Sequence, residues 1–289
     1  MIEDSNQTSS LSLSQIILIL LLFGSFIFAF FPVLKDLVDV WLNSDDYSHG
    51  FFIIPIGAYI TWRKRNILAA TSVKSTPWGL AGLIFSLLLY MVGYFGEIYT
   101  VKSLSLVLVL AGIVLYLLGY GFFKELLFPL FILLFMIPVP AQIYSMVTIP
   151  LQLMVSKLSA AVASLMGIPI YRQGNVIHLF DRSLEVVQAC SGLRSMISLL
   201  TLSAIFAYFT LKSNFLGTIL LLFGIPAALI VNIMRVLIII VALNWFNYDL
   251  TAGTAHILFG VTIFILALIL IAGAKGVLSI WDRSLAAES

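Results

Sequence analysis

The chain contains one cysteine, and the residues around it suit nucleophilic chemistry. Cys190 lies in the compact stretch Gln188–Ser195, QACSGLRS, between a polar, strand-like segment and a long apolar run. We expect Cys190 to start a helix, where the positive end of the helix dipole favours the thiolate. Ser191 and Gly192 are small and leave the approach to the thiol open. A lone cysteine is also compatible with a small buried hydrophobe, so the rest of the chain must decide between the two.

An arginine inside an apolar run is the second candidate. Arg235 lies 20 residues after Phe215, where the run begins. At 1.5 Å per residue this is a rise of about 30 Å, which brings Arg235 to the outer boundary of the hydrocarbon, the expected level of Cys190. An arginine buried in a membrane is costly and therefore indicates function. The alternative is that its side chain extends to the outer headgroups.

A histidine completes the set. His256 opens the last apolar run, just after the polar loop 244–253, and the same counting brings it to the same level. Together the three residues suit acyl transfer: a thiolate attacks a carbonyl, a histidine moves the proton, and an arginine stabilises the oxyanion. Taken alone, His256 is equally compatible with a solvated residue at the membrane surface.

Two further polar positions have open roles. Glu185, five residues before Cys190, is the nearest acid and either orients His256 or only solvates its segment. His49 lies in Asp45–Gly50, just before an apolar run, and is either a second functional histidine or part of a helix-capping cluster of Asp and Ser.

The elements that position these residues belong to a membrane protein. The chain has 289 residues, of which 62% are hydrophobic and 10% charged, and a soluble domain cannot bury that much apolar surface. The net charge of +2 gives no case for nucleic acid. A single cysteine excludes an internal disulfide and a cysteine-based metal cluster, and His49, His178 and His256 lack metal-site spacing. We therefore expect no metal and no cofactor.

The fold that we predict is an all-α polytopic membrane protein with about eight transmembrane helices. It forms a single domain over 1–289, with a membrane core over about 15–275 and no fused soluble domain. The residues before Leu11 carry no Lys or Arg, so the first run is expected to be a retained span and not a signal peptide. The spans are expected at 15–32, 50–62, 78–95, 104–121, 125–139, 191–211, 215–243 and 254–274.

Residues 142–189 are expected to form an extracytoplasmic unit. The segment 142–167 is apolar but contains Pro150, Gln152 and Lys157, so we interpret it as a helix at the outer interface and not as a ninth span. Residues 168–188 alternate in polarity and contain two turn signals, which predicts a meander of two or three strands that leads directly to Cys190. Such a polar sheet belongs in water or in a wet cavity.

Basic residues in the short loops give the orientation. Arg63, Lys64, Arg65 and Lys74 mark one loop as cytoplasmic, and both termini are then expected in the cytoplasm. The excess of basic residues on that side is small. If residues 142–167 formed a ninth span, the membrane orientation of every later segment would be reversed.

These residues resemble the exosortase family, bacterial relatives of the archaeosortases, over about residues 40–275. The matching motifs are Asp46–Gly50 (DYSHG), Gly174-Asn175, Leu184–Ser195 (LEVVQACSGLRS), Asn232 with Arg235, and His256. The block from Ala189 to Ser195 is the specific part of this pattern, whereas Asn-x-x-Arg alone is weak.

The resemblance implies a membrane cysteine peptidase, and in particular a transpeptidase. Its substrates would be exported proteins that end in a Pro-Glu-Pro motif, a transmembrane helix and a basic tail (PEP-CTERM). Cleavage would proceed through a thioacyl intermediate at the outer, periplasmic face of the bacterial inner membrane. Cys190 would be the nucleophile, Arg235 the electrostatic partner and His256 the acid and base. Arg194 and Asn232 would have structural or substrate-binding roles.

Substrate binding follows only in outline. The substrate helix must pack beside the enzyme in membrane lipid, and the meander and 142–167 would form the walls of a cleft for the Pro-Glu-Pro motif. Arg172 and Arg182 are candidates to pair with its Glu. Two other classes stay open: a transporter or lipid-handling protein of envelope polysaccharide export, in which Arg235 binds an anionic headgroup, and a non-enzymatic scaffold for such export.

Overall fold

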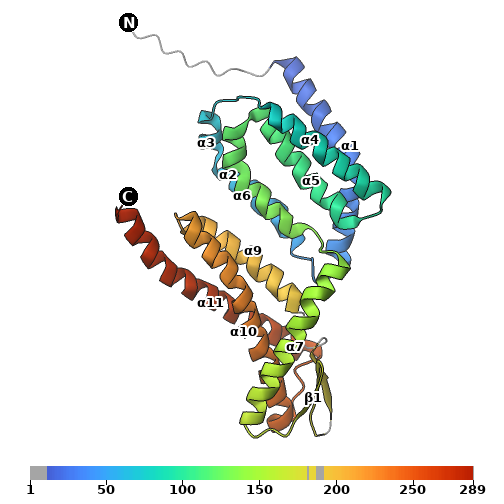
Figure 1. Ribbon diagram of the computed structural model, residues 1–289, viewed down its shortest axis with the longest axis vertical. Helices are drawn as coiled ribbons and strands as arrows, with labels where there is room; N and C mark the ends of the chain where they lie inside the picture. Colours follow the sequence, from blue (N-terminus) through green and yellow to red (C-terminus); the bar gives the residue numbers. More distant parts are fainter. Residues whose placement is uncertain (1–11, 181, 187–191, 289) are drawn as a thin grey trace.

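The computed structural model describes residues 12–180, 182–186 and 192–288 (Figure 1). Its helices are α1 (Leu13–Asn43), α2 (Gly50–Arg63), α3 (Arg65–Ala70), α4 (Pro77–Phe95), α5 (Tyr99–Ile113), α6 (Tyr120–Ile132), α7 (Ala141–Leu165), α9 (Gly192–Thr210), α10 (Asn214–Phe246) and α11 (Gly253–Glu288). A π-helical turn, Val114–Leu118, extends α5, and a 3-10 turn, Leu133–Met136, extends α6. The strands are β1 (Tyr171–Gln173), β2 (Val176–His178) and β3 (Ser183–Glu185). The predicted fold class, helical with a small sheet before Cys190, is confirmed.

Six helices of the described chain are long and apolar enough to cross a membrane. They are α1 from Leu20 onward, α4, α5 with its π-helical turn, α7, α10, and α11 as far as Arg283. The predicted spans at α2 and α6 are shorter, as is the apolar part of α9, Met196–Thr210. The multi-pass membrane class is thus confirmed, while length alone does not separate α7 from the other spans.

The first helix is longer than its apolar run. The sequence predicts an end at residue 32, but α1 continues through Lys35 and Asp36 to Asn43. Asp36 forms a salt bridge with Lys102 of α5, in which Oδ2 and Nζ are 2.9 Å apart. The stripe of Phe30, Val33, Leu37 and Trp41 is also buried at helical spacing. This continued stripe holds the helix together where the charges suggest a loop.

The helices form two groups that lie side by side in Figure 1. The first group contains α1 to α6, and the second contains α9, α10 and α11. Glycines allow neighbouring helices within a group to pack closely, as in the pair α4 and α5. A Cβ on Gly112 of α5 would lie 3.1 Å from the Cα atom of Leu83 in α4. Such small residues replace the hydrophobic driving force that helices lack inside a membrane.

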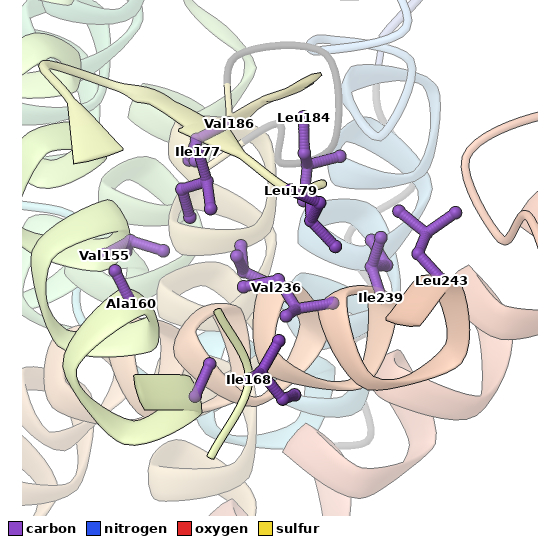
Figure 2. Close-up of a cluster of buried hydrophobic side chains, with 12 residues drawn as sticks. Val155, Ala160, Ile168, Ile177, Leu179, Leu184, Val186, Val236, Ile239 and Leu243 are labelled. Carbon is purple, nitrogen blue, oxygen red and sulfur yellow. The ribbon is translucent and has the colours of Figure 1, made fainter. Parts of the chain in front are cut away.

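The predicted meander is present. Its three strands are antiparallel in the order β1-β2-β3, and Gly174, at φ +63°, makes the turn between the first two. Ile177, Leu184 and Val186 point into a buried cluster with Val155 of α7 and the last three turns of α10 (Figure 2). We call this assembly, α7 with the sheet and residues 236–246 of α10, the sheet unit.

The position of α7 differs from that of a bundle helix. In Figure 1 it runs across the direction that α6 and α9 share, at the end of the molecule where α9 begins. Its second half packs on α10 and the sheet. Ser159 Oγ donates to the Ile233 carbonyl at 3.2 Å, and Ser156 Oγ donates to the Gly174 carbonyl at 3.0 Å. We call this end of the molecule the sheet end.

Candidate active site at the start of α9

Cys190 lies outside the described residues, as do its neighbours from Val187 to Ser191. The described elements on either side are β3, which ends at Glu185, and α9, which begins at Gly192. The site is therefore built from the elements around this segment. Arg194 belongs to the first turn of α9.

The packing of α9 on α10 fixes the level of Arg235. A Cβ on Gly224 of α10 would lie 3.4 Å from the Cα atom of Leu200 in α9, and one on Gly217 would lie 3.7 Å from the Ala207 Cβ. The two helices are therefore antiparallel. Gly192, eight residues before Leu200, is level with Asn232, eight residues after Gly224. Arg235 lies three residues further along, about 4.5 Å beyond the first residue of α9.

The contact between α10 and α11 fixes the level of His256. Asp282 accepts the backbone N–H of Ser213 at 2.9 Å, so the end of α11 lies beside the start of α10. His256 is 26 residues, or about 39 Å, from Asp282, and Arg235 is 22 residues, or about 33 Å, from Ser213. The two side chains thus leave their helices at levels about one turn apart. The structure brings Arg235, His256 and the start of α9 to the sheet end together.

A hydrogen bond sets the tautomer of His256. Its Nδ1 lies 3.1 Å from the Leu250 carbonyl oxygen. Because a carbonyl oxygen only accepts, Nδ1 must carry the hydrogen, and neutral His256 has its lone pair on Nε2. The bond also orients the ring. A histidine held in this way is able to take a proton at Nε2 and return it.

The surroundings of Arg235 strengthen the electrostatic effect of its charge. The side chain is half-buried, and its Nε is shielded from solvent. A cation in such a site of low dielectric acts more strongly on a nearby developing anion than one in water. Asn232, 8% exposed, lies three residues earlier on the same side of α10. It lines a small cavity with Val155 of α7 and Met196 of α9.

Arg172, in β1, and Arg182, just before β3, are the arginines proposed to pair with the substrate Glu, and both bind parts of this chain. Arg172 Nη1 donates to the Gly174 carbonyl at 2.6 Å. Arg182 Nη2 donates to Asn247 Oδ1 at 2.8 Å, which links the sheet to the end of α10. Glu185 closes β3, where it pairs with Val176.

His49 belongs to a contact that the sequence does not predict. Its Nε2 lies 3.1 Å from the Phe135 carbonyl, and the Tyr47 hydroxyl accepts the Val139 N–H at 3.0 Å. Nearby, Tyr144 of α7 donates to Asp46 Oδ2 at 2.9 Å. The motif before α2 thus holds the start of α7. Burial is the main reason why the pKa of His49 is lowered.

Metal ligands do not gather in the part of the chain described here: no group of three His, Asp or Glu side chains within it is placed to hold an ion.

One comparison with known proteins is informative. A family model described as transmembrane exosortase matches residues 41–273, most of the chain. The matched range includes every element that meets at the sheet end. Comparisons with curated proteins and with solved structures give no match.

Proposed function

The chain belongs to the transmembrane exosortase family, and from this premise we propose that it is a membrane cysteine peptidase that acts as a transpeptidase. We propose that it cleaves the PEP-CTERM signals of exported proteins at the outer face of the bacterial inner membrane. One observation supports this most. The start of α9, which follows Cys190 in the chain, lies at the same end of the molecule as Arg235 of α10 and the oriented His256 of α11.

The proposed reaction has two halves. In the first, His256 Nε2 takes the proton of the Cys190 thiol, and the thiolate attacks the scissile carbonyl carbon. The tetrahedral oxyanion is stabilised by the Arg235 guanidinium. The C–N bond then breaks, and the leaving amine takes its proton from Nε2 of His256, which leaves a thioester on Cys190.

In the second half, a water molecule or an amine attacks the thioester carbonyl. His256 Nε2 takes the proton of this nucleophile and returns it to the departing cysteine sulfur. Water gives a hydrolysed product, whereas an amine gives a transpeptidation product. The Leu250 carbonyl serves both halves, because it keeps the lone pair of neutral His256 on Nε2.

In this proposal the sheet end faces the periplasm, and α7 lies along that surface. A sheet of three short, partly exposed strands is unsuited to hydrocarbon, which supports placing the sheet unit in water. The substrate helix would lie in lipid beside the bundle, with its Pro-Glu-Pro motif against the sheet unit. Arg172 and Arg182 are proposed to pair with the Glu of the motif, for which each would exchange its present partner.

The test is cleavage of a substrate peptide, with the motif, a transmembrane helix and a basic tail, by the protein in proteoliposomes. Cys190→Ala is expected to abolish cleavage. His256→Gln and Arg235→Lys are expected to lower the rate by about 10²–10⁴-fold. Arg65→Lys is the matched control, because exposed Arg65 lies at the start of α3, over the Trp62 ring. Charge reversal at Arg172 and Arg182 is expected to weaken substrate binding.

The thioester provides a second readout. Wild-type protein is expected to yield a mass adduct on Cys190 that hydroxylamine removes. Undiminished cleavage by Cys190→Ala would overturn the proposal. Loss of the protein's function in cells with Arg235→Ala but not with Cys190→Ala would favour the lipid-handling alternative.

A further inference from the structure

A groove separates the two groups of helices at the end opposite the sheet. It has a volume of about 580 Å³ and lies between α6 on one side and α9 with α10 on the other. Phe128 of α6 stacks on Tyr208 of α9, with ring centroids 4.0 Å apart. We call this the α6–α9 groove.

Polarity changes along the groove. Lys212 and Ser213, in the loop between α9 and α10, and Asn214, the first residue of α10, line one end of it. Ala204, eight residues before Lys212, and Leu221, seven residues after Asn214, line it about 10–12 Å deeper. The groove is therefore polar and cationic at its mouth and apolar within, which is the polarity of a phospholipid with its headgroup at the mouth.

The mouth is basic. Lys212 is exposed, and the Arg63 guanidinium lies 5.4 Å from the ring of Phe209, the residue next to Tyr208. Carboxylates at this end offset part of that charge: Glu125 meets Lys64 at 3.0 Å, and Asp282, which accepts the backbone N–H groups of Lys212 and Ser213, offsets one of the two cations Lys212 and Arg63. Positive charge is thus left to face a ligand.

We propose that the α6–α9 groove binds one anionic phospholipid from the leaflet at this end, which the loop charges predict to be cytoplasmic. Its phosphate lies by Lys212, with Arg63 over the neighbouring Phe209 ring as a second cation, and an acyl chain lies against Phe128 and Phe131. Basic pockets between membrane helices on this side are suited to anionic headgroups. The charge disfavours a substrate helix, because the basic tail expected of a substrate would meet the same cations.

The test is native mass spectrometry of the protein released from nanodiscs with equal amounts of phosphatidylglycerol and phosphatidylcholine. Wild type is expected to retain phosphatidylglycerol preferentially. Lys212→Gln should lower that preference about fivefold, the effect of one basic charge near a surface. Lys74→Gln is the control, since Lys74 is an exposed lysine in the loop before α4, outside the groove lining. Thr218→Trp should block retention without changing charge, because exposed Thr218 lines the groove.

Three outcomes would overturn the proposal: equal retention of the two lipids, retention unchanged in both Lys212→Gln and Thr218→Trp, or a photo-crosslinker at position 218 that captures the substrate peptide instead of lipid. Lipid retention needs no catalysis and is also measurable in Cys190→Ala. A failure here therefore leaves the peptidase proposal intact, and a failed cleavage assay leaves this one intact.

Discussion

His49 illustrates how a buried side chain makes stability depend on pH. Burial lowers its pKa below the ordinary value of 6.5 in the folded protein. The unfolded chain then binds a proton that the folded chain does not. The stabilisation is therefore present above pH 6.5 and is lost as the pH falls from 6.5 to the lowered folded value.

We expect the midpoint temperature of thermal unfolding in detergent to decrease as the pH is lowered from 7.5 to 5. His49→Gln should make this decrease smaller. The glutamine amide is still able to donate to the Phe135 carbonyl but does not titrate. Intrinsic fluorescence during heating measures the midpoint. An equally steep pH profile in the variant would show that other groups cause it.

Gly50 is expected to tolerate no side chain. A Cβ there would overlap the indole ring of Trp41, which is buried and donates to the Met136 carbonyl at 3.1 Å. Gly50→Ala should therefore destabilise the protein by about 1–3 kcal/mol, the usual effect of overpacking. The measurement is the thermal midpoint beside that of Gly82→Ala, where a Cβ has nothing within 4 Å. Equal midpoints would contradict the expectation.

Single residues were predictable where one helix decides their position. The level of Arg235 follows from counting along α10, because the rise per residue is constant. The partner of His49 was not predictable, since Phe135 is 86 residues away and is reached only after several helices have packed. The roles of Cys190, Arg235 and His256 stay predictions.

Among the elements, the α9–α10 pair has most influence on the site. Gly224→Leu should push the two helices apart, because a Cβ there would lie 3.0 Å from Ser203 Oγ and close to the α9 backbone. We expect a lower thermal midpoint and slower peptide cleavage, since Arg235 would move away from the start of α9. Gly273→Leu is the control, because a Cβ on Gly273 of α11 has nothing within 4 Å. Equal cleavage by both variants would show that this spacing does not matter.

Elements were predictable where one pattern dominates, and their ends were not. Alternation with turn residues correctly predicted the meander, and apolar runs located the long helices. The end of α1 was wrong by eleven residues, because Lys35 and Asp36 suggest a loop while buried Leu37 and Trp41 continue the helix. The short α3 was missed, because six residues carry too little periodicity to detect.

At the scale of the whole molecule, the prediction concerns which ends of α7 face water. If α7 lies along the periplasmic surface, both of its ends are on the same side. We expect Gln142→Cys and Arg172→Cys, each in Cys190→Ala, to react with an impermeant maleimide in cells with a permeable outer membrane. Lys212→Cys is the control for the opposite side and should react only after the inner membrane is opened.

Labelling of Gln142→Cys and Arg172→Cys from opposite sides would mean that α7 spans the membrane. The length and apolarity of α7 are those of a membrane span, so the labelling pattern decides between the two positions. The contacts of Ser156 and Ser159 with the sheet and α10 give the physical ground for the surface position.

The shared core of the sheet unit also sets an order of events during biosynthesis. Residues 141–186 leave the ribosome before Val236, Ile239, Ile240 and Leu243, which complete their buried cluster. About 60 residues separate Val186 from the end of α10. At typical synthesis rates of 5–20 residues per second, the part of α10 that completes the cluster follows roughly 3–12 s later. During that interval the apolar side chains of α7 and the strands that later pack on α10 are exposed. A chaperone at the same face of the membrane would be able to bind them.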